Sequence, residues 1–214
     1  MEHQNQEAFL KLSDHNFEYF AEADNMLRAG VHIQNHKSQK RFFDFVEDNI
    51  EPLTEYYEKL YKIKLTTQIT VDNKFYFLDS SDMQNSKLKK EKLDPLTTLF
   101  AIFLYYLHKV EKQFSYSLTK QEILDELNTN QKIKPLIQKL FFGKEKEDTS
   151  SVQKTLDKWV GSSLRQLEKL GWVYFPDDNE KFEVLPAFER IALIYNETIY
   201  NIDEIKISYE YQNQ

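Results

Sequence analysis

The sequence of 214 residues contains no cysteine and only four glycines. Without cysteine the chain cannot form disulfides, zinc–thiolate sites, iron–sulfur centres or a thiol nucleophile, and a reducing cytoplasm is the expected compartment. The glycines stand apart at positions 30, 143, 161 and 171. No glycine-rich loop can therefore cradle a nucleotide as in P-loop or Rossmann proteins, which excludes most nucleotide hydrolysis and dinucleotide chemistry.

Long apolar segments are also missing. The longest nearly apolar run spans the 12 residues from Leu96 to Leu107, whereas a membrane-crossing helix needs about 20. This run predicts a buried core helix. The N-terminal sequence has no basic start followed by an apolar stretch, so we expect no secretory signal and a cytoplasmic protein.

The net charge of −7 is distributed unevenly along the chain. Residues 1–60 and 171–214 each carry a net charge of −6, residues 61–130 carry +1, and residues 131–170 carry +4. A locally basic stretch in an acidic chain is compatible with one focused contact to an anion. The alternative is that this stretch is only the solvated face of a helix.

The first half of the chain has the pattern of helices followed by a β-hairpin. Apolar residues at three- and four-residue steps predict the helices, a glycine at position 30 ends the first of them, and β-branched residues on both sides of Asp72 and Asn73 predict the hairpin. The predicted elements are helices at residues 17–27 and 37–62, the second kinked or divided by Pro52, and strands at residues 65–71 and 74–78.

The same order returns after a polar stretch at residues 79–92, which has no apolar period. Asp94 with Pro95, the capping box from Thr119 to Glu122, and Gly171 mark helix ends. The predicted elements are helices at residues 94–111, 121–127 and 151–170, a basic loop between the last two that includes residues 141–148, strands at residues 172–175 and 181–184, and a final helix at residues 186–194.

This repetition predicts a mainly α protein with small β-hairpins (α+β), built as tandem winged-helix domains. In a winged helix, the helix before the hairpin is the one usually presented to the major groove of DNA, which here is the helix over residues 151–170. The predicted parts are an N-terminal winged-helix domain at residues 1–80, a linker at 81–93, a C-terminal winged-helix domain at 94–195 and an acidic tail at 196–214.

Basic side chains on the predicted recognition helix are candidates for DNA contact. Their 4-7-4 spacing puts them close to one stripe of the helix, which we expect beside the apolar seam, and long cations on a rigid helix suit phosphate contacts. The first turn of this helix has no cluster of asparagine or arginine, so base-specific readout is not expected. The alternative is again a solvated helix face. The candidates are Lys154, Lys158, Arg165 and Lys169, extended by Lys181 at the second hairpin, with Lys37, Lys40 and Arg41 as a second phosphate site.

Catalytic and metal sites find little support in the sequence. His32 and His36 are four residues apart, but no HExxH pattern surrounds them. The carboxylates are spread over helix faces and the serines lack a nucleophile-elbow context. We therefore expect no enzyme activity, no metal and no cofactor.

Ordered sequence matches over both halves resemble the MukE/MksE family, the small KITE-type subunits of bacterial SMC condensins. The likeness covers roughly residues 17–194. The segments that carry it are residues 26–33 (MLRAGVHI), 42–45 (FFDF), 56–57 (YY), 75–78 (FYFL), 162–164 (SSL), 167–171 (LEKLG) and 181–182 (KF).

The resemblance implies a non-enzymatic, homodimeric subunit that binds a kleisin of the MukF or MksF type and, through it, an SMC ATPase of the MukB or MksB type. It also implies a nucleoid-associated protein that contributes to the capture of double-stranded DNA, without sequence preference, for chromosome organisation and partition. Two alternatives stay open. One is a transcription regulator with tandem winged helices, and the other is the equivalent subunit of a plasmid-defence SMC system.

Overall fold

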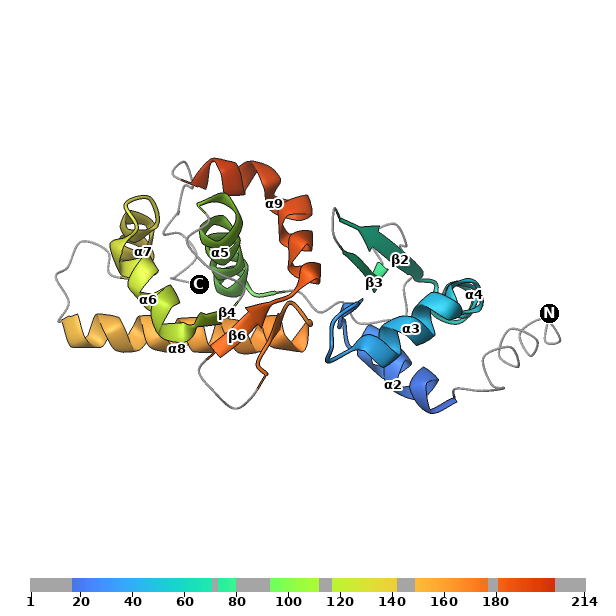
Figure 1. Ribbon diagram of the computed structural model, residues 1–214. Helices are drawn as coiled ribbons and strands as arrows, with labels where there is room; N and C mark the ends of the chain where they lie inside the picture. Colours follow the sequence, from blue (N-terminus) through green and yellow to red (C-terminus); the bar gives the residue numbers. More distant parts are fainter. Residues whose placement is uncertain are drawn as a thin grey trace. The chain divides into compact units, whose positions relative to one another are not determined.

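The chain forms two compact units, and each is described by itself. The first unit contains the described residues up to 79, joined by two short segments of the C-terminal half, 169–172 and 185–187. The second contains the remaining described residues from 93 onward. The computed structural model (Figure 1) describes residues 17–70, 73–79, 93–111, 117–141, 149–176 and 181–202.

Several predicted segments lie outside the described residues. They are most of the linker at 81–93, most of the basic loop around 141–148, the tail beyond residue 202 and parts of both hairpin turns. The division into domains at residues 1–80 and 94–195 stays a prediction.

Helix α2 (Phe17–Arg28) opens the described part of the first unit and confirms the first predicted helix. It ends at Gly30, whose φ of 83° lies in the left-handed region that glycine adopts without strain. The N–H of Val31 then donates to the carbonyl of Met26 at 2.9 Å, which satisfies one of the last helical carbonyls.

The second predicted helix is divided into α3 (Lys40–Asp48) and α4 (Ile50–Tyr61). The break falls at Asn49, three residues before Pro52. Proline has no N–H to donate to the carbonyl of Asp48, and its ring would clash there in a continuous helix. Pro52 therefore sits in the first turn of a new helix, where neither problem arises.

The sheet of the first unit has three antiparallel strands in the order β1-β3-β2. The hairpin strands β2 (Lys64–Ile69) and β3 (Lys74–Asp79) lie where the sequence predicts them, with Leu65 opposite Leu78. Strand β1 (Ile33–Gln34) pairs with β3 and was not predicted, because two residues are too short to show an alternating pattern.

A buried glutamine ties the two C-terminal segments into the first unit. Gln34 is fully buried, its Nε2 donates to the carbonyl of Gly171 at 2.6 Å, and its Oε1 accepts from the N–H of Ala187 at 2.8 Å. Trp172 Nε1 donates to His32 Nδ1 at 3.2 Å. If the Gln34 amide lost these partners, its buried polar groups would be left unsatisfied, which is costly. These bonds therefore hold the segments at residues 169–172 and 185–187 against the strand that contains Gln34.

The second unit is mostly helical. Asp94 caps its first helix by accepting from the N–H groups of Leu96 and Thr97, both at 3.0 Å, and the predicted capping box of Thr119 and Glu122 is present. The helices are α5 (Pro95–Tyr105), continued by a π-helical turn η1 (Tyr106–Val110), then α6 (Lys120–Thr129), α7 (Ile133–Phe141), α8 (Thr149–Lys169) and α9 (Arg190–Tyr200), the last preceded by a 3₁₀ turn η2 (Pro186–Glu189).

One expectation for this unit is wrong. The stretch before residue 142 is not loop but helix α7, whose buried Ile133, Leu136 and Ile137 follow helical spacing, and the proline at position 135 is tolerated in the first turn. The final helix, predicted to end near Ile194, is interrupted at Tyr195, where φ is −122° and ψ is 26°. A further helical segment after this kink extends α9 to Tyr200 and was not predicted.

A second three-stranded antiparallel sheet repeats the topology of the first, with the last strand again in the centre. Its strands are β4 (Ser117–Thr119), β6 (Lys181–Val184) and β5 (Val173–Tyr174), in that spatial order. Helices with small antiparallel sheets confirm the α+β class. The order of helices and hairpin is the one expected of tandem winged helices, and that finer assignment stays a prediction.

Candidate nucleic-acid interface

Helix α8 is held in the second unit by one apolar face. Leu156, Val160 and Leu164 are buried along it. Trp159 packs edge-on against Phe100 of α5, with 5.6 Å between ring centroids, and its Nε1 donates to a backbone carbonyl of α5 at 3.1 Å. An anchored helix of this kind presents its opposite face in a fixed position (Figure 1).

The opposite face carries the predicted cations, here called the basic row: Lys154, Lys158, Arg165 and Lys169. Successive helical residues turn by about 100°, so these four side chains leave the helix within about 60° of one another. They lie across from the buried residues, and the expectation that they flank the apolar seam is wrong. All four are exposed, and none forms a hydrogen bond or ion pair with another described residue.

One further lysine pairs with α8, and a second lies opposite its neighbour in the sheet. Lys120, the first residue of α6, pairs with Asp157 of α8 at 2.7 Å. Lys181 is exposed, and the strand register pairs it with Thr119, directly before Lys120. Hydrogen bonds from the N–H and hydroxyl of Thr119 lower the pKa of Glu122, and the charge of Lys181 adds to this effect. Sequence spacing singled out Lys181 but not Lys120.

The second predicted phosphate site lies around the start of α3, and its described cations are engaged. Lys40 forms an ion pair with Asp44 one turn along the helix. Arg41 pairs with Glu22 at 3.1 Å and lies over the ring of Phe42, 4.5 Å from its centroid. Lys37 is exposed just before the helix. These contacts leave less free positive charge than the sequence suggests.

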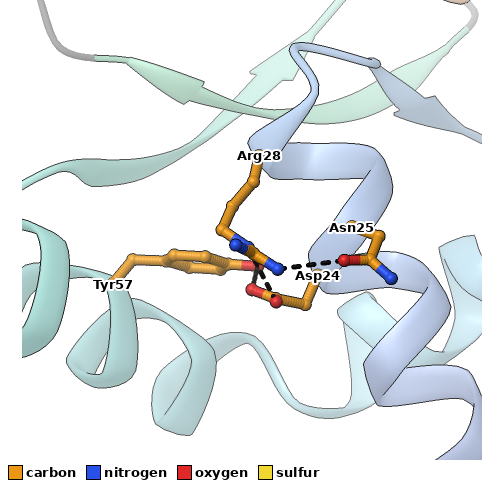
Figure 2. Close-up of polar contacts among 4 residues, drawn as sticks. All are labelled: Asp24, Asn25, Arg28 and Tyr57. Atoms are coloured by element: carbon orange, nitrogen blue, oxygen red, sulfur yellow. Dashed lines mark hydrogen bonds and ion pairs between the residues drawn. The ribbon is translucent and has the colours of Figure 1, made fainter. Parts of the chain in front are cut away.

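A buried polar cluster joins α2 to α4 in the first unit (Figure 2). Asp24, only 7% exposed, accepts from the hydroxyl of Tyr57 at 3.0 Å and from Nε of Arg28 at 2.8 Å. The same guanidinium donates to Asn25 Oδ1 at 2.9 Å. Spacing alone did not identify this cluster, because Asp24 and Tyr57 are 33 residues apart.

The electrostatics of this cluster are those of a structural site. Burial raises the pKa of Tyr57 far above its ordinary value, and the neighbouring Asp24 raises it further. Burial lowers the pKa of Arg28, but the charge of Asp24, its hydrogen bond and the neighbouring Tyr61 and Tyr56 together outweigh this, so the net shift of the pKa is upward. Tyr57 is fully buried, so its hydroxyl stays protonated and out of reach of a substrate. The cluster fixes α2 against α4.

The histidine pair offers no metal site in the described structure. His32 is buried and accepts from Trp172, whereas His36 contacts Ser38 Oγ at 2.8 Å. Among the residues that the structure describes, no group of three or more histidine, aspartate or glutamate side chains is placed to hold a metal ion. No described helix has both the length and the apolar character of a membrane span.

Fold and site define an α+β protein of two units with an exposed cationic face and a closed polar cluster. The sequence model of the MksE family, described as condensin complex protein MksE, matches residues 18–192. The chain belongs to this family, which confirms the resemblance. It is therefore a condensin complex protein, one of several subunits of an SMC complex in chromosome organisation. A search of curated proteins finds no match.

Proposed function

We propose that this protein is the non-catalytic condensin subunit that forms a homodimer, binds the kleisin, and contributes to DNA capture. ATP hydrolysis then belongs to the SMC subunit to which the kleisin connects it. Membership of the MksE family supports the place in the complex. The complex acts in the cytoplasm, on the nucleoid, in chromosome organisation and partition.

The basic row carries the DNA part of this proposal. It presents four exposed cations along about 22 Å of a rigid helix, since 15 steps of about 1.5 Å separate its ends. Each lysine or arginine that neutralises a phosphate releases counterions and contributes about 0.9 to the salt dependence of log K. Four such contacts would give modest affinity that falls steeply with salt.

DNA capture by this row is proposed to be independent of sequence. Phosphate contacts orient a protein on the duplex but do not read bases. The first turn of α8 consists of threonine, serine, serine and valine, which lack the arginine or asparagine forks that read guanine or adenine. Lys181 extends the contact, whereas Lys37, Lys40 and Arg41 contribute less because Lys40 and Arg41 are already paired.

Charge reversal within the assembled complex tests the proposal. The chain with Lys154, Lys158 and Arg165 all changed to Glu is co-expressed with the kleisin and SMC subunits of the same condensin. DNA retention by the complex is expected to fall at least about 100-fold, because three attractive contacts become repulsive. Dimerisation and kleisin co-elution on gel filtration stay unchanged. The control changes Lys59, Lys62 and Lys64 of the first unit to Glu.

The outcomes separate the competing functions. Loss of kleisin co-elution in the α8 variant would make the row a protein interface and contradict the DNA assignment. Failure of the unaltered chain to join a kleisin complex would contradict the condensin role. Binding of the isolated protein to one operator sequence with little salt dependence would favour the transcription regulator instead.

A further inference from the structure

The basic row has a gap at one turn of the helix. An α-helix repeats every 3.6 residues, so one side chain per turn along this face falls at positions 154, 158, 161, 165 and 169. Four of these positions hold a cation, and the middle one is Gly161. The four cations of the row are therefore not evenly spaced. Lys158 and Arg165 are seven residues apart, which is about 10 Å along the helix axis at about 1.5 Å per residue.

A lysine from another helix occupies this gap. A Cβ atom placed on Gly161 would lie 3.3 Å from Nζ of Lys120 and 3.7 Å from its Cε. The end of the Lys120 side chain therefore lies on α8 at the position where a side chain of residue 161 would be. Glycine inside a helix is unfavourable by roughly 0.5–1 kcal/mol relative to alanine, and at this position its missing side chain makes room for the ammonium group.

The occupant of the gap is held by one carboxylate. Asp157 lies one turn before Gly161, and its Oδ1 is 2.7 Å from Lys120 Nζ. Both side chains are accessible to solvent, Lys120 at 33% and Asp157 at 52%. A pair this exposed has a small net stability, so another anion can replace the carboxylate at little cost.

A carboxylate already stands at the start of α6. Glu122 accepts from the N–H of Thr119 at 2.6 Å and from its hydroxyl at 2.8 Å, and its own N–H donates to the Thr119 hydroxyl at 3.1 Å. Because this negative charge disfavours a second anion at the same helix end, the Lys120 ammonium is the group through which α6 can attract a phosphate.

We infer that Lys120 is the fifth phosphate-binding cation of the row, and that Asp157 holds its ammonium group in place until a phosphate of the nucleic-acid backbone displaces the carboxylate. With Lys120 the row is continuous, with five cations spaced about one turn apart over about four turns of α8. Asp157 acts as an internal competitor for the same cation. This inference rests on the proposed DNA contact of α8 and adds one residue and one regulatory contact to it.

Removal of the cation is the first test. The purified chain and its Lys120→Gln variant are titrated by fluorescence anisotropy into a labelled duplex of about 30 base pairs, longer than the row, over a range of salt from about 0.05 M. The association constant is expected to fall about fivefold near 0.1 M salt, with a salt slope shallower by about 0.9. The control is Lys59→Gln, which removes an equally exposed, ion-paired lysine (Lys59 with Glu55) from the first unit.

Removal of the competitor is the second test. Asp157→Asn is expected to raise the association constant about threefold, the size of one exposed ion pair. Glu55→Gln makes the same charge change in the control pair of Lys59 and Glu55, and it should leave the association constant for DNA unaltered. In a chain that already carries Lys120→Gln, the gain from Asp157→Asn shrinks by at least half, because its main target is gone.

The outcomes test separately the DNA contact of α8, the role of Lys120 and the competition by Asp157. If the unaltered chain fails to bind duplex even at low salt, both the proposed α8 contact and this inference are wrong. If it binds and Lys120→Gln binds equally well with the same slope, only the role of Lys120 is wrong. An equal gain from Asp157→Asn with and without Lys120 would show that Asp157 repels phosphate directly, and the competition would be disproved.

Discussion

The helices that precede the two hairpins, α4 and α8, occupy the same place in their units but carry opposite charge. Helix α4 has three glutamates and one lysine, a net charge of −2. Helix α8 has four cations against Asp157 and Glu168, a net charge of +2. An open hollow along α4 is lined by Ile50, Glu51, Thr54, Glu55, Glu58 and Lys59. Helices at the same place in the fold therefore present different charge to a ligand.

The comparison extends to how cations are used in the two regions. In the first unit Arg41 of α3 pairs with Glu22 of α2, and Lys74 of β3 pairs with Glu47 of α3, so these two cations connect different elements. Arg28 pairs with Asp24 of its own helix. On α8 the basic row makes no such contact with the described residues. A cation that already has a carboxylate partner must lose it before it can bind phosphate, whereas the row starts with solvated charges.

The largest expected effect is on DNA binding, when the cations of the basic row and those of the second predicted phosphate site are neutralised separately. Changing Lys154, Lys158 and Arg165 to Gln should lower the DNA association constant by more than about 100-fold near 0.1 M salt and make the salt slope shallower by nearly 3, about 0.9 per lost contact. Changing Lys37, Lys40 and Arg41 to Gln should cost less than about threefold. Anisotropy titrations at several salt concentrations measure both. Equal losses would erase the distinction between the two sets.

For stability we expect the larger effect in the first unit and the smaller effect on α8. Asp24→Ala removes the acceptor of a buried tyrosine hydroxyl and of a partly buried guanidinium, and should lower the free energy of unfolding of the first unit by about 3 kcal/mol. Arg165→Ala on α8 should change the free energy of unfolding of the second unit by less than about 0.5 kcal/mol, as expected for an exposed side chain that forms no hydrogen bond or ion pair with a described residue.

Urea unfolding can follow the two units separately, because the chain has two tryptophans. Trp172 belongs to the first unit and Trp159 to the second. With Trp159 changed to Phe, fluorescence reports the first unit, and with Trp172 changed to Phe it reports the second. A cost for Arg165→Ala as large as that for Asp24→Ala would mean that the row has a structural role.

Elements with local signals were predictable from the sequence. The capping residues Asp94 and Thr119, and the glycines 30 and 171, act on their own backbone or on neighbours a few residues away, and the structure places helix ends at each of them. The period of α8 likewise comes from its own side chains, so counting could group the four cations of the basic row on one stripe, although it was wrong to place that stripe beside the apolar seam and not across from it.

Features that depend on distant residues could not be predicted in this way. Strands β1 and β4 have two and three residues and exist because β3 and β6 pair with them. The pairing of Arg41 with Glu22 bridges 19 residues and reduces the free positive charge of the second predicted phosphate site. The approach of Lys120 to Gly161 depends on the packing of α6 against α8, which no spacing rule contains.

A smaller expected difference between the two units is the pH dependence of stability that comes from the residues at the helix starts. The hydrogen bonds from Thr119 lower the pKa of Glu122, so its carboxylate stabilises the fold above its unfolded pKa and this contribution is lost as pH falls through the lower folded value. Glu122→Gln should cost about 0.5 kcal/mol at neutral pH, because glutamine can keep the capping bond but not the charge. It should also flatten the decline in stability of the second unit between about pH 5 and pH 3.

The matched change in the first unit is Asn49→Ala at the start of α4, where the side chain makes no bond to α4 but donates from Nδ2 to the carbonyl of Phe45 in α3 at 2.8 Å. Its cost should be independent of pH, because no carboxylate is involved. Urea unfolding of both variants across this pH range makes the comparison. An unchanged pH profile in Glu122→Gln would contradict the assigned role of this carboxylate.

The smallest expected effect is a gain, and it distinguishes the glycine on α8 from one in the first unit. Gly161 lies inside a helix, so Gly161→Ala should stabilise the second unit by about 0.5 kcal/mol, less whatever is needed to move the flexible end of Lys120. In the first unit Gly171 has a φ of 68°, and an added Cβ would lie 3.0 Å from the carbonyl oxygen of His32. Gly171→Ala should therefore destabilise. Thermal unfolding that showed losses at both positions would mean that the contact of Lys120 with α8 is rigid, in which case a phosphate could not draw the lysine away from Asp157.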